Sequence, residues 1–292
     1  MMIYETNTNM KYVFSILFIC YFSVAGYTQN TKPVKADILL DNDLLKQLEI
    51  DDKFINAVEY TSDGFILLSS SSQFYLLGIG GIVPIFESWD GRSGIESFAV
   101  TAEGILIIVS GNTLYQANLD PSFTKVLDIP DRNMGVSSKY KDIYVFDRIW
   151  KNSKKNYSIY KISENKKITT LVEIPTPILA VFEQSSLLIF STKNTLLGVD
   201  INTKNLFHLL ALPQEDEIIS IVGDTINHAF YFSTYNTIYQ IKESEIEVIS
   251  EDFGGILRYD GEGLLIFNPE KQLIIRLRNN LLYLDAKNVE IH

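Results

Sequence analysis

A repeat of about forty residues constrains this chain more than any other feature. The segment from Ile55 to Gly64 reads Ile-Asn-Ala-Val-Glu-Tyr-Thr-Ser-Asp-Gly, and the segment from Ile95 to Gly104 reads Ile-Glu-Ser-Phe-Ala-Val-Thr-Ala-Glu-Gly. Both continue, without a gap in the alignment, into two β-rich stretches. Related units begin near Gly135, Ile178, Ile218 and Gly263. Because such units bury their apolar faces only against their neighbours, the repeat predicts one continuous array.

Each unit contains short strands rich in Val, Ile, Phe and Tyr, and a period near forty with four strands per unit is typical of a β-propeller. The sixth unit has its second and third strands at 273–277 and 280–283, and the chain then ends without a fourth. The N-terminal segment 44–50 resembles the fourth strands of other units. The sequence therefore predicts an all-β, six-bladed β-propeller of four-stranded antiparallel blades, closed by an N-terminal strand that completes the last blade. Such closure removes free sheet edges.

The N-terminus reads as an export signal. Lys11 precedes an almost wholly apolar run from Tyr12 to Ala25, and small residues follow around Gly26. The run is too short to span a bilayer comfortably. We therefore predict a signal peptide over 1–26, with Met10 as an alternative start, then a linker over 27–43 and the propeller over 44–292. No transmembrane span is expected.

The net charge limits the classes of partner that this protein can bind, and the cysteine content bears on its cellular compartment. The net charge of −11 disfavours nucleic acid and anionic lipid, because neither would find a basic surface. The single cysteine, Cys20, lies inside the predicted signal, and Ile19 before it argues against lipidation. The sequence thus predicts an exported protein, periplasmic or secreted, that is not a lipoprotein.

Both tryptophans fall in connections expected on the loop-bearing face of the ring. Trp89 and Arg92 lie between the first two units, and Trp150, Lys151 and Lys154 lie in a connection longer than its counterparts. Exposed aromatic side chains beside charge are what protein or carbohydrate recognition uses. These five residues are the predicted binding site, and the alternative is that Trp89 caps the core and the lysines are only solvated.

The pattern resembles the broad group of six-bladed propellers that includes the NHL-repeat, YWTD and TolB-like proteins, although no intact Tyr-Trp-Thr-Asp motif is present. Lactonase-type members hold a calcium ion at the channel mouth with Glu, Asn and Asp. That resemblance implies a candidate metal set here of Asn56, Glu96 and Asn133, near the starts of innermost strands. Otherwise, no catalytic residues, phosphate loop or paired-histidine metal motif stands out.

The sequence as a whole predicts a non-catalytic binding or scaffolding module of the bacterial envelope, with a protein or carbohydrate ligand on its loop face and no cofactor. The competing hypothesis is a calcium-dependent hydrolase or lactonase that uses the metal set.

Overall fold

The computed structural model describes most of the chain between residues 36 and 278. The described residues are 36–47, 55–61, 64–78, 81–85, 93–117, 122–138, 142–151, 155–212, 216–224, 229–242, 245–251, 253–259 and 263–278. The predicted signal peptide, 1–26, lies outside them. Among the described residues, no helix is long and apolar enough to cross a membrane.

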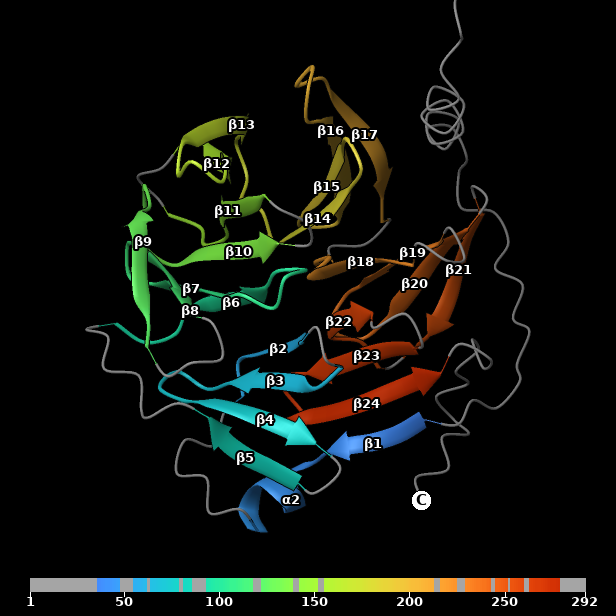
Figure 1. The fold of residues 1–292 in the computed structure, drawn as a ribbon. Coiled ribbons are helices and arrows are strands. Elements are labelled where there is room, and N and C mark those ends of the chain that lie inside the picture. Colours follow the sequence, from blue (N-terminus) through green and yellow to red (C-terminus); the bar gives the residue numbers. More distant parts are fainter. Residues whose placement is uncertain are drawn as a thin grey trace, which may run out of the picture.

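Six sheets, each of four antiparallel strands, form the fold (Figure 1). Blade 1 contains β2 (Ala57–Tyr60), β3 (Ile66–Ser69), β4 (Phe74–Gly78) and β5 (Gly81–Ile85), and blade 2 contains β6 (Ser97–Val100), β7 (Leu106–Ser110), β8 (Thr113–Ala117) and β9 (Thr124–Asp128). Blade 3 contains β10 (Met134–Ser138), β11 (Ile143–Asp147), β12 (Tyr157–Ile162) and β13 (Ile168–Ile174), and blade 4 contains β14 (Ala180–Gln184), β15 (Leu187–Thr192), β16 (Thr195–Asp200) and β17 (Leu206–Ala211). Blade 5 contains β18 (Ser220–Asp224), β19 (Ala229–Ser233), β20 (Ile238–Lys242) and β21 (Glu245–Ser250), and blade 6 contains β22 (Ile256–Tyr259), β23 (Gly263–Asn268), β24 (Leu273–Arg278) and β1 (Ala36–Leu40). The predicted fold class is confirmed.

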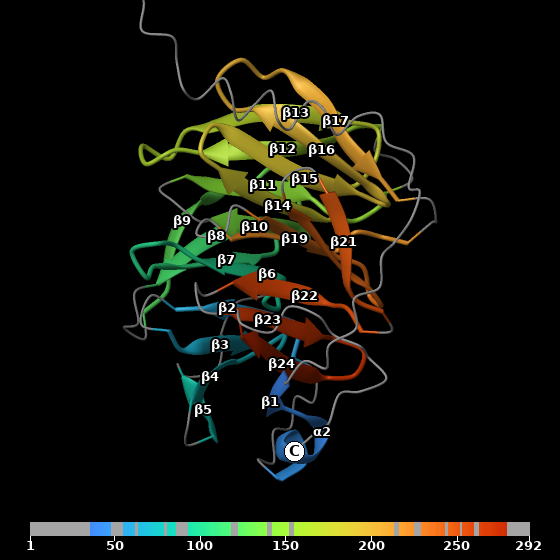
Figure 2. The same cartoon turned by 90° about the vertical axis from the view of Figure 1, so that its right-hand side faces the viewer.

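The first strand of each blade faces the centre of the ring. The innermost strands contact one another in the cyclic order β2, β6, β10, β14, β18 and β22, and β22 then meets β2 again. Figures 1 and 2 show the blades arranged around this axis. Residues that begin the innermost strands therefore converge at one mouth of a central channel.

Apolar side chains from adjacent blades interleave to form the core. Phe74 of blade 1 meets Phe98 of blade 2 edge to face, with ring centroids 5.3 Å apart. In the same way, Phe182 of blade 4 packs over Gly223 of blade 5, where a Cβ would come within 2.5 Å of the ring. A larger residue at 223 would force the two blades apart, because protein cores are close-packed.

The N-terminal strand closes the ring, as predicted, but it is not the segment that the sequence indicated. β1 pairs antiparallel with β24, with Ile38 opposite Ile275, so the closing strand lies earlier than 44–50. The described part of that segment belongs instead to the short helix α2 (Asn42–Gln47). The carboxylate of Asp41 accepts the backbone N–H groups of Leu44 at 2.8 Å and Asp43 at 3.0 Å, which is the arrangement of a helix N-cap.

The sixth repeat also begins earlier than predicted. The segment beginning at Gly263 is the second strand, β23, rather than the first, and 273–277 belongs to the third strand, β24. The predicted third strand at 280–283 lies outside the described residues. The true first strand, β22, contains the charged residue Arg258, which is partly buried. Arg258 is accommodated there because it pairs with Glu59 of blade 1 at 2.6 Å.

Candidate functional site

Trp150 presents a large apolar surface on the loop face of blade 3. It lies in the connection between β11 and β12 and is 58% exposed, and its neighbour Ile149 is 42% exposed. The indole stacks on the ring of Tyr157, with centroids 5.8 Å apart and planes inclined by 24°. One face of the indole is thus supported by the protein, while much of the side chain remains open to solvent.

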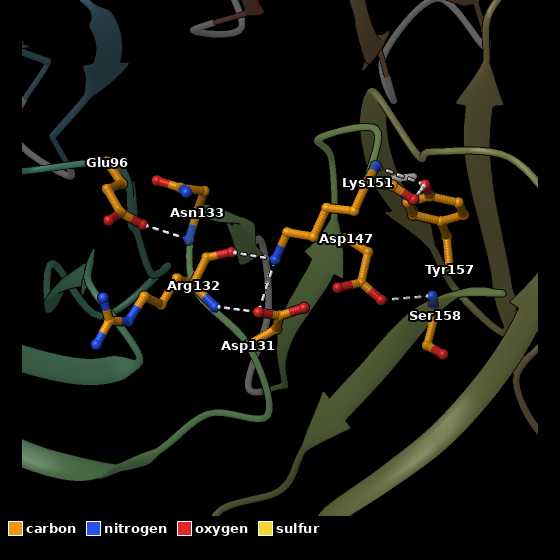
Figure 3. Close-up of polar contacts among 8 residues, drawn as sticks. All are labelled: Glu96, Asp131, Arg132, Asn133, Asp147, Lys151, Tyr157 and Ser158. Carbon is orange, nitrogen blue, oxygen red and sulfur yellow. Dashed lines mark hydrogen bonds and ion pairs between the residues drawn. The ribbon is translucent and has the colours of Figure 1, made fainter. Parts of the chain in front are cut away.

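Tyr157 ties this loop to the core of blade 3. The tyrosine is fully buried at the start of β12. Its hydroxyl accepts the backbone N–H of Lys151 at 2.8 Å and donates to the backbone carbonyl of Lys151 at 3.2 Å (Figure 3). The residue that follows Trp150 is therefore held at both of its backbone polar groups, and the indole is presented from a fixed backbone.

Lys151 also joins two loops of the same face. Its ammonium group lies 2.6 Å from a carboxylate oxygen of Asp131, in the connection between β9 and β10, and 3.5 Å from the carbonyl of Arg132 (Figure 3). Both side chains of the ion pair are half-buried, so we assign the pair a modest contribution of about 0.2–1 kcal/mol. Its main consequence is geometric, because it fixes the loop of Trp150 against blade 2.

The base of the loop is anchored by Asp147, the last residue of β11. Its buried carboxylate accepts the backbone N–H of Ser158 at 2.8 Å, and its backbone carbonyl accepts the N–H of Ile178 at 2.9 Å. The side-chain bond joins the two ends of the loop across β11 and β12. The backbone bond extends the support to the segment that leads into blade 4.

Glu96 connects blades 2 and 3 at the channel mouth. One of its carboxylate oxygens accepts the backbone N–H of Gly111 at 3.1 Å. The other accepts the backbone N–H of Asn133 at 2.7 Å, as Figure 3 shows. Asn133 has a φ of 57°, a left-handed conformation that asparagine tolerates better than most residues do. In this arrangement the carboxylate organises loops.

A cavity of about 370 Å³ occupies the centre of the ring. Asn56, Glu96 and Arg148 line it near the loop face, and Glu59, Arg258 and Tyr259 line it elsewhere along the innermost strands. Arg148 follows β11 and donates to the backbone carbonyl of Glu96 at 2.5 Å. Burial lowers the pKa of Arg148 and raises that of Glu59, whose raised pKa is partly offset by Arg258. Arg148 stays protonated at neutral pH, because guanidinium groups in proteins do not lose their proton there.

The structure places only some of the predicted site residues. Trp89, Arg92 and Lys154 lie outside the described residues, so their roles remain predictions. Of the predicted metal set, Asn56 and Glu96 line the cavity, and Asn133 contacts Glu96 through its backbone. Among the described residues, no group of three or more His, Cys, Asp or Glu side chains is placed to hold a metal ion. The calcium hypothesis therefore rests on the asparagines as well as on Glu96.

Sequence reasoning missed the residues that support the exposed ones. Tyr157 looks like one more aromatic residue in a strand, and Asp131 like one more acidic loop residue. Arg148 could have been singled out, because it directly follows the apolar strand β11 at the predicted channel mouth. No pattern in the sequence distinguishes a tyrosine that packs from one that also holds a loop.

Comparison with known proteins identifies the fold and no family. No family model matches the chain, and no curated protein matches it by sequence. A candidate gluconolactonase of known structure is similar with a TM-score of 0.65 and 10% identity, over 89% of this chain and 96% of that one. Virginiamycin B lyase from Staphylococcus aureus is similar with a TM-score of 0.58 and 14% identity, over 78% of this chain and 81% of that one. The extracellular domain of a candidate hybrid two-component system from Bacteroides thetaiotaomicron has a TM-score of 0.58 and 15% identity, over 80% of this chain and 32% of that one.

These likenesses establish a six-bladed propeller, in agreement with the resemblance drawn from the repeat. The similar proteins include enzymes and an extracellular domain. At identities this low, the likeness extends to the fold alone, since one fold hosts many unrelated activities.

Proposed function

We propose that this chain is an exported recognition module that binds a protein or carbohydrate partner through Trp150 on its loop face. One observation carries the proposal. Trp150 is 58% exposed, yet it is stacked on a fully buried tyrosine whose hydroxyl fixes the adjacent backbone. An exposed aromatic side chain that is already fixed before binding loses little conformational entropy when a partner binds. Rigid recognition surfaces gain affinity for this reason.

The surroundings of Trp150 suit a mixed partner surface. Ile149 extends the apolar area, while the ion pair of Lys151 with Asp131 supplies polar groups beside it. An aromatic centre with a polar rim is the usual composition of a binding surface. Export is supported by the apolar segment after Lys11 and by the likeness to an extracellular domain.

The test compares two aromatic truncations on opposite faces of the ring. Trp150→Ala removes the proposed anchor, and Phe65→Ala removes an exposed aromatic residue from the β2–β3 connection, at the far end of the innermost strands. Binding is measured for the full chain against a glycan panel and against fractionated envelope proteins. Since a central tryptophan contributes about 2 kcal/mol or more to an interface, we expect roughly a thirtyfold loss for Trp150→Ala.

The control variant Phe65→Ala shows whether a loss of binding is specific to Trp150. Phe65→Ala should bind as the wild type does, and both variants should melt close to the wild-type temperature. Equal binding by wild type and Trp150→Ala, or equal losses in both variants, would contradict the proposal. Retention by sugars alone or by proteins alone would identify the class of partner.

The alternative, a calcium-dependent hydrolase or lactonase, is favoured by the cavity that Asn56 and Glu96 line and by the likeness to a candidate gluconolactonase. Calcium takes about six to eight oxygen ligands, so Asn56, Glu96 and Asn133 would need help from water or substrate. A ligand that binds only the folded state must raise its stability. A calcium-dependent rise in melting temperature that disappears in Glu96→Gln would support the alternative, and an unchanged melting temperature would count against it.

A further inference from the structure

Arg148 brings a positive charge into the central cavity, and no carboxylate of the described residues contacts it. Its hydrogen bond within the described part of the chain runs to the backbone carbonyl of Glu96. A guanidinium has five N–H donors, so most of them remain available. Arg148 is partly buried, and a charged group withdrawn from water is costly unless it is paired. The arginine is thus placed to gain from an incoming anion.

The two acidic residues that line the cavity already have other partners. Glu59 pairs with Arg258 at 2.6 Å on the innermost strands of blades 1 and 6. Glu96 attracts Arg148 through space, but its two oxygens face the backbone N–H groups of Gly111 and Asn133. Neither carboxylate satisfies the guanidinium of Arg148 directly.

Asn56 adds a neutral polar group at the same mouth. It precedes β2 as Glu96 precedes β6, and both residues line the cavity. Its backbone N–H donates to the carbonyl of Ser69, and its exposed carboxamide makes no hydrogen bond within the described residues. An amide can donate to a carboxylate that an arginine holds.

The walls below this mouth combine polar and apolar side chains. Phe98, Phe146 and Phe182 line the cavity from blades 2, 3 and 4. Serine hydroxyls also line it, but Ser97 and Ser220 are engaged with the backbone of the following blades, at Val136 and Leu257 respectively. A volume of about 370 Å³ lies within the range of about 300–1,000 Å³ that is usual for small-molecule sites.

We propose that the central cavity binds a small carboxylic acid, with its carboxylate on Arg148 and Asn56 and the rest of the molecule within the cavity. Guanidinium and carboxylate form paired, charge-assisted hydrogen bonds, which are among the stronger polar contacts in proteins. The site is separate from the surface around Trp150 and needs no metal ion. It would give the module a small-molecule ligand in addition to its partner.

The test uses benzoate as the probe and benzamide as its neutral counterpart of nearly the same shape. Binding to the full chain is measured by calorimetry in the presence of a chelator. Benzoate should bind and raise the melting temperature, and benzamide should bind at least about tenfold more weakly, because hydrogen bonds to a charged group are roughly twice as strong as neutral ones. Equal binding of the two probes, absence of benzoate binding, or binding that requires calcium would overturn the proposal.

Four variants locate the site. Arg148→Gln should lose benzoate binding by roughly tenfold or more, while Arg132→Gln, an exposed arginine on the same face, should bind as the wild type does. Arg148 also bonds to blade 2, so its replacement could disturb the fold, and Asn56→Asp provides a second variant at an exposed position. The added negative charge should weaken the binding of benzoate without unfolding the protein. Undiminished binding in Asn56→Asp would contradict the assignment. Trp150→Ala should leave benzoate binding unchanged, which separates this site from the partner surface.

Discussion

Tyr157 is the residue on which the presentation of Trp150 depends. Its ring supports the indole and its hydroxyl holds both backbone polar groups of Lys151. These two functions are separable, because phenylalanine keeps the ring and loses the hydroxyl. The same tyrosine shows why part of the site was not predictable: an aromatic residue in a strand is expected from the repeat, but its contact with a loop six residues away depends on how that loop folds.

Tyr157→Phe should loosen the loop of Trp150 while leaving the propeller folded. We expect a loss of about 1–2 kcal/mol in the free energy of unfolding, since two hydrogen bonds are removed from a loop that water can reach. Urea unfolding measures this loss. Tyr160→Phe on the same strand is the control and should change stability less. A tighter partner interaction in Tyr157→Phe would contradict the view that a fixed loop favours binding.

The ionisation of Glu59 should make the free energy of unfolding depend on pH. Burial raises its pKa above the ordinary value of 4.5, although Arg258 opposes part of that change. The folded state therefore holds the proton more tightly than the unfolded state. The stabilisation from Glu59 is fully present below about pH 4.5 and is lost as the pH rises through the raised pKa.

Unfolding of the wild type and of Glu59→Gln across this pH range tests the expectation. The free energy of unfolding of the wild type, relative to the variant, should fall as the pH rises, because glutamine does not titrate. Glu173→Gln on the outer strand β13 controls for the loss of an exposed charge. A relative stability that rises with pH would show that the ion pair with Arg258 outweighs burial.

At the scale of elements, strand β1 closes the ring by pairing with β24 of blade 6. Leu40 is almost fully buried in a cluster with Leu68 of blade 1 and Phe267 of blade 6. Leu40→Ala should therefore cost about 2–5 kcal/mol of unfolding free energy, as truncations of buried leucine do. The matched variant Val83→Ala, exposed on the outermost strand of blade 1, should stay within about 0.5 kcal/mol of the wild type in denaturant unfolding. Similar losses in both would mean that β1 adds little to closure.

Five blades could be predicted from the sequence because their apolar strands recur at a nearly constant spacing. The sixth could not, since its first strand contains the charged residue Arg258, which pairs with Glu59 from the other end of the repeat. The closing segment was misplaced for a related reason. Leu44 and Leu45 gave 44–50 the apolar content of a strand, whereas the carboxylate of Asp41 caps a helix there. Both errors concern contacts between residues that a local pattern does not connect.

At the scale of the whole molecule, the ring brings six strand beginnings to one mouth and six sets of connections to one face. The channel contains Arg148, which no carboxylate of the described residues contacts, and the rim carries Trp150, which is exposed and stacked on Tyr157. The repeat predicted where such residues would gather. It did not predict which of them would be left available, because that depends on the hydrogen bonds each neighbour makes.

The central claim is that Trp150 is the contact point for a partner, and its own fluorescence tests this most directly. The chain has two tryptophans, so Trp89→Phe leaves Trp150 as the single reporter. In the free protein, its emission should be quenched readily by acrylamide while its anisotropy stays high, as expected for an exposed but fixed indole. Addition of the glycan or protein retained in the binding experiment should shift the emission to shorter wavelength and protect it from acrylamide. Emission and quenching that stay unchanged when the partner is bound would contradict the claim.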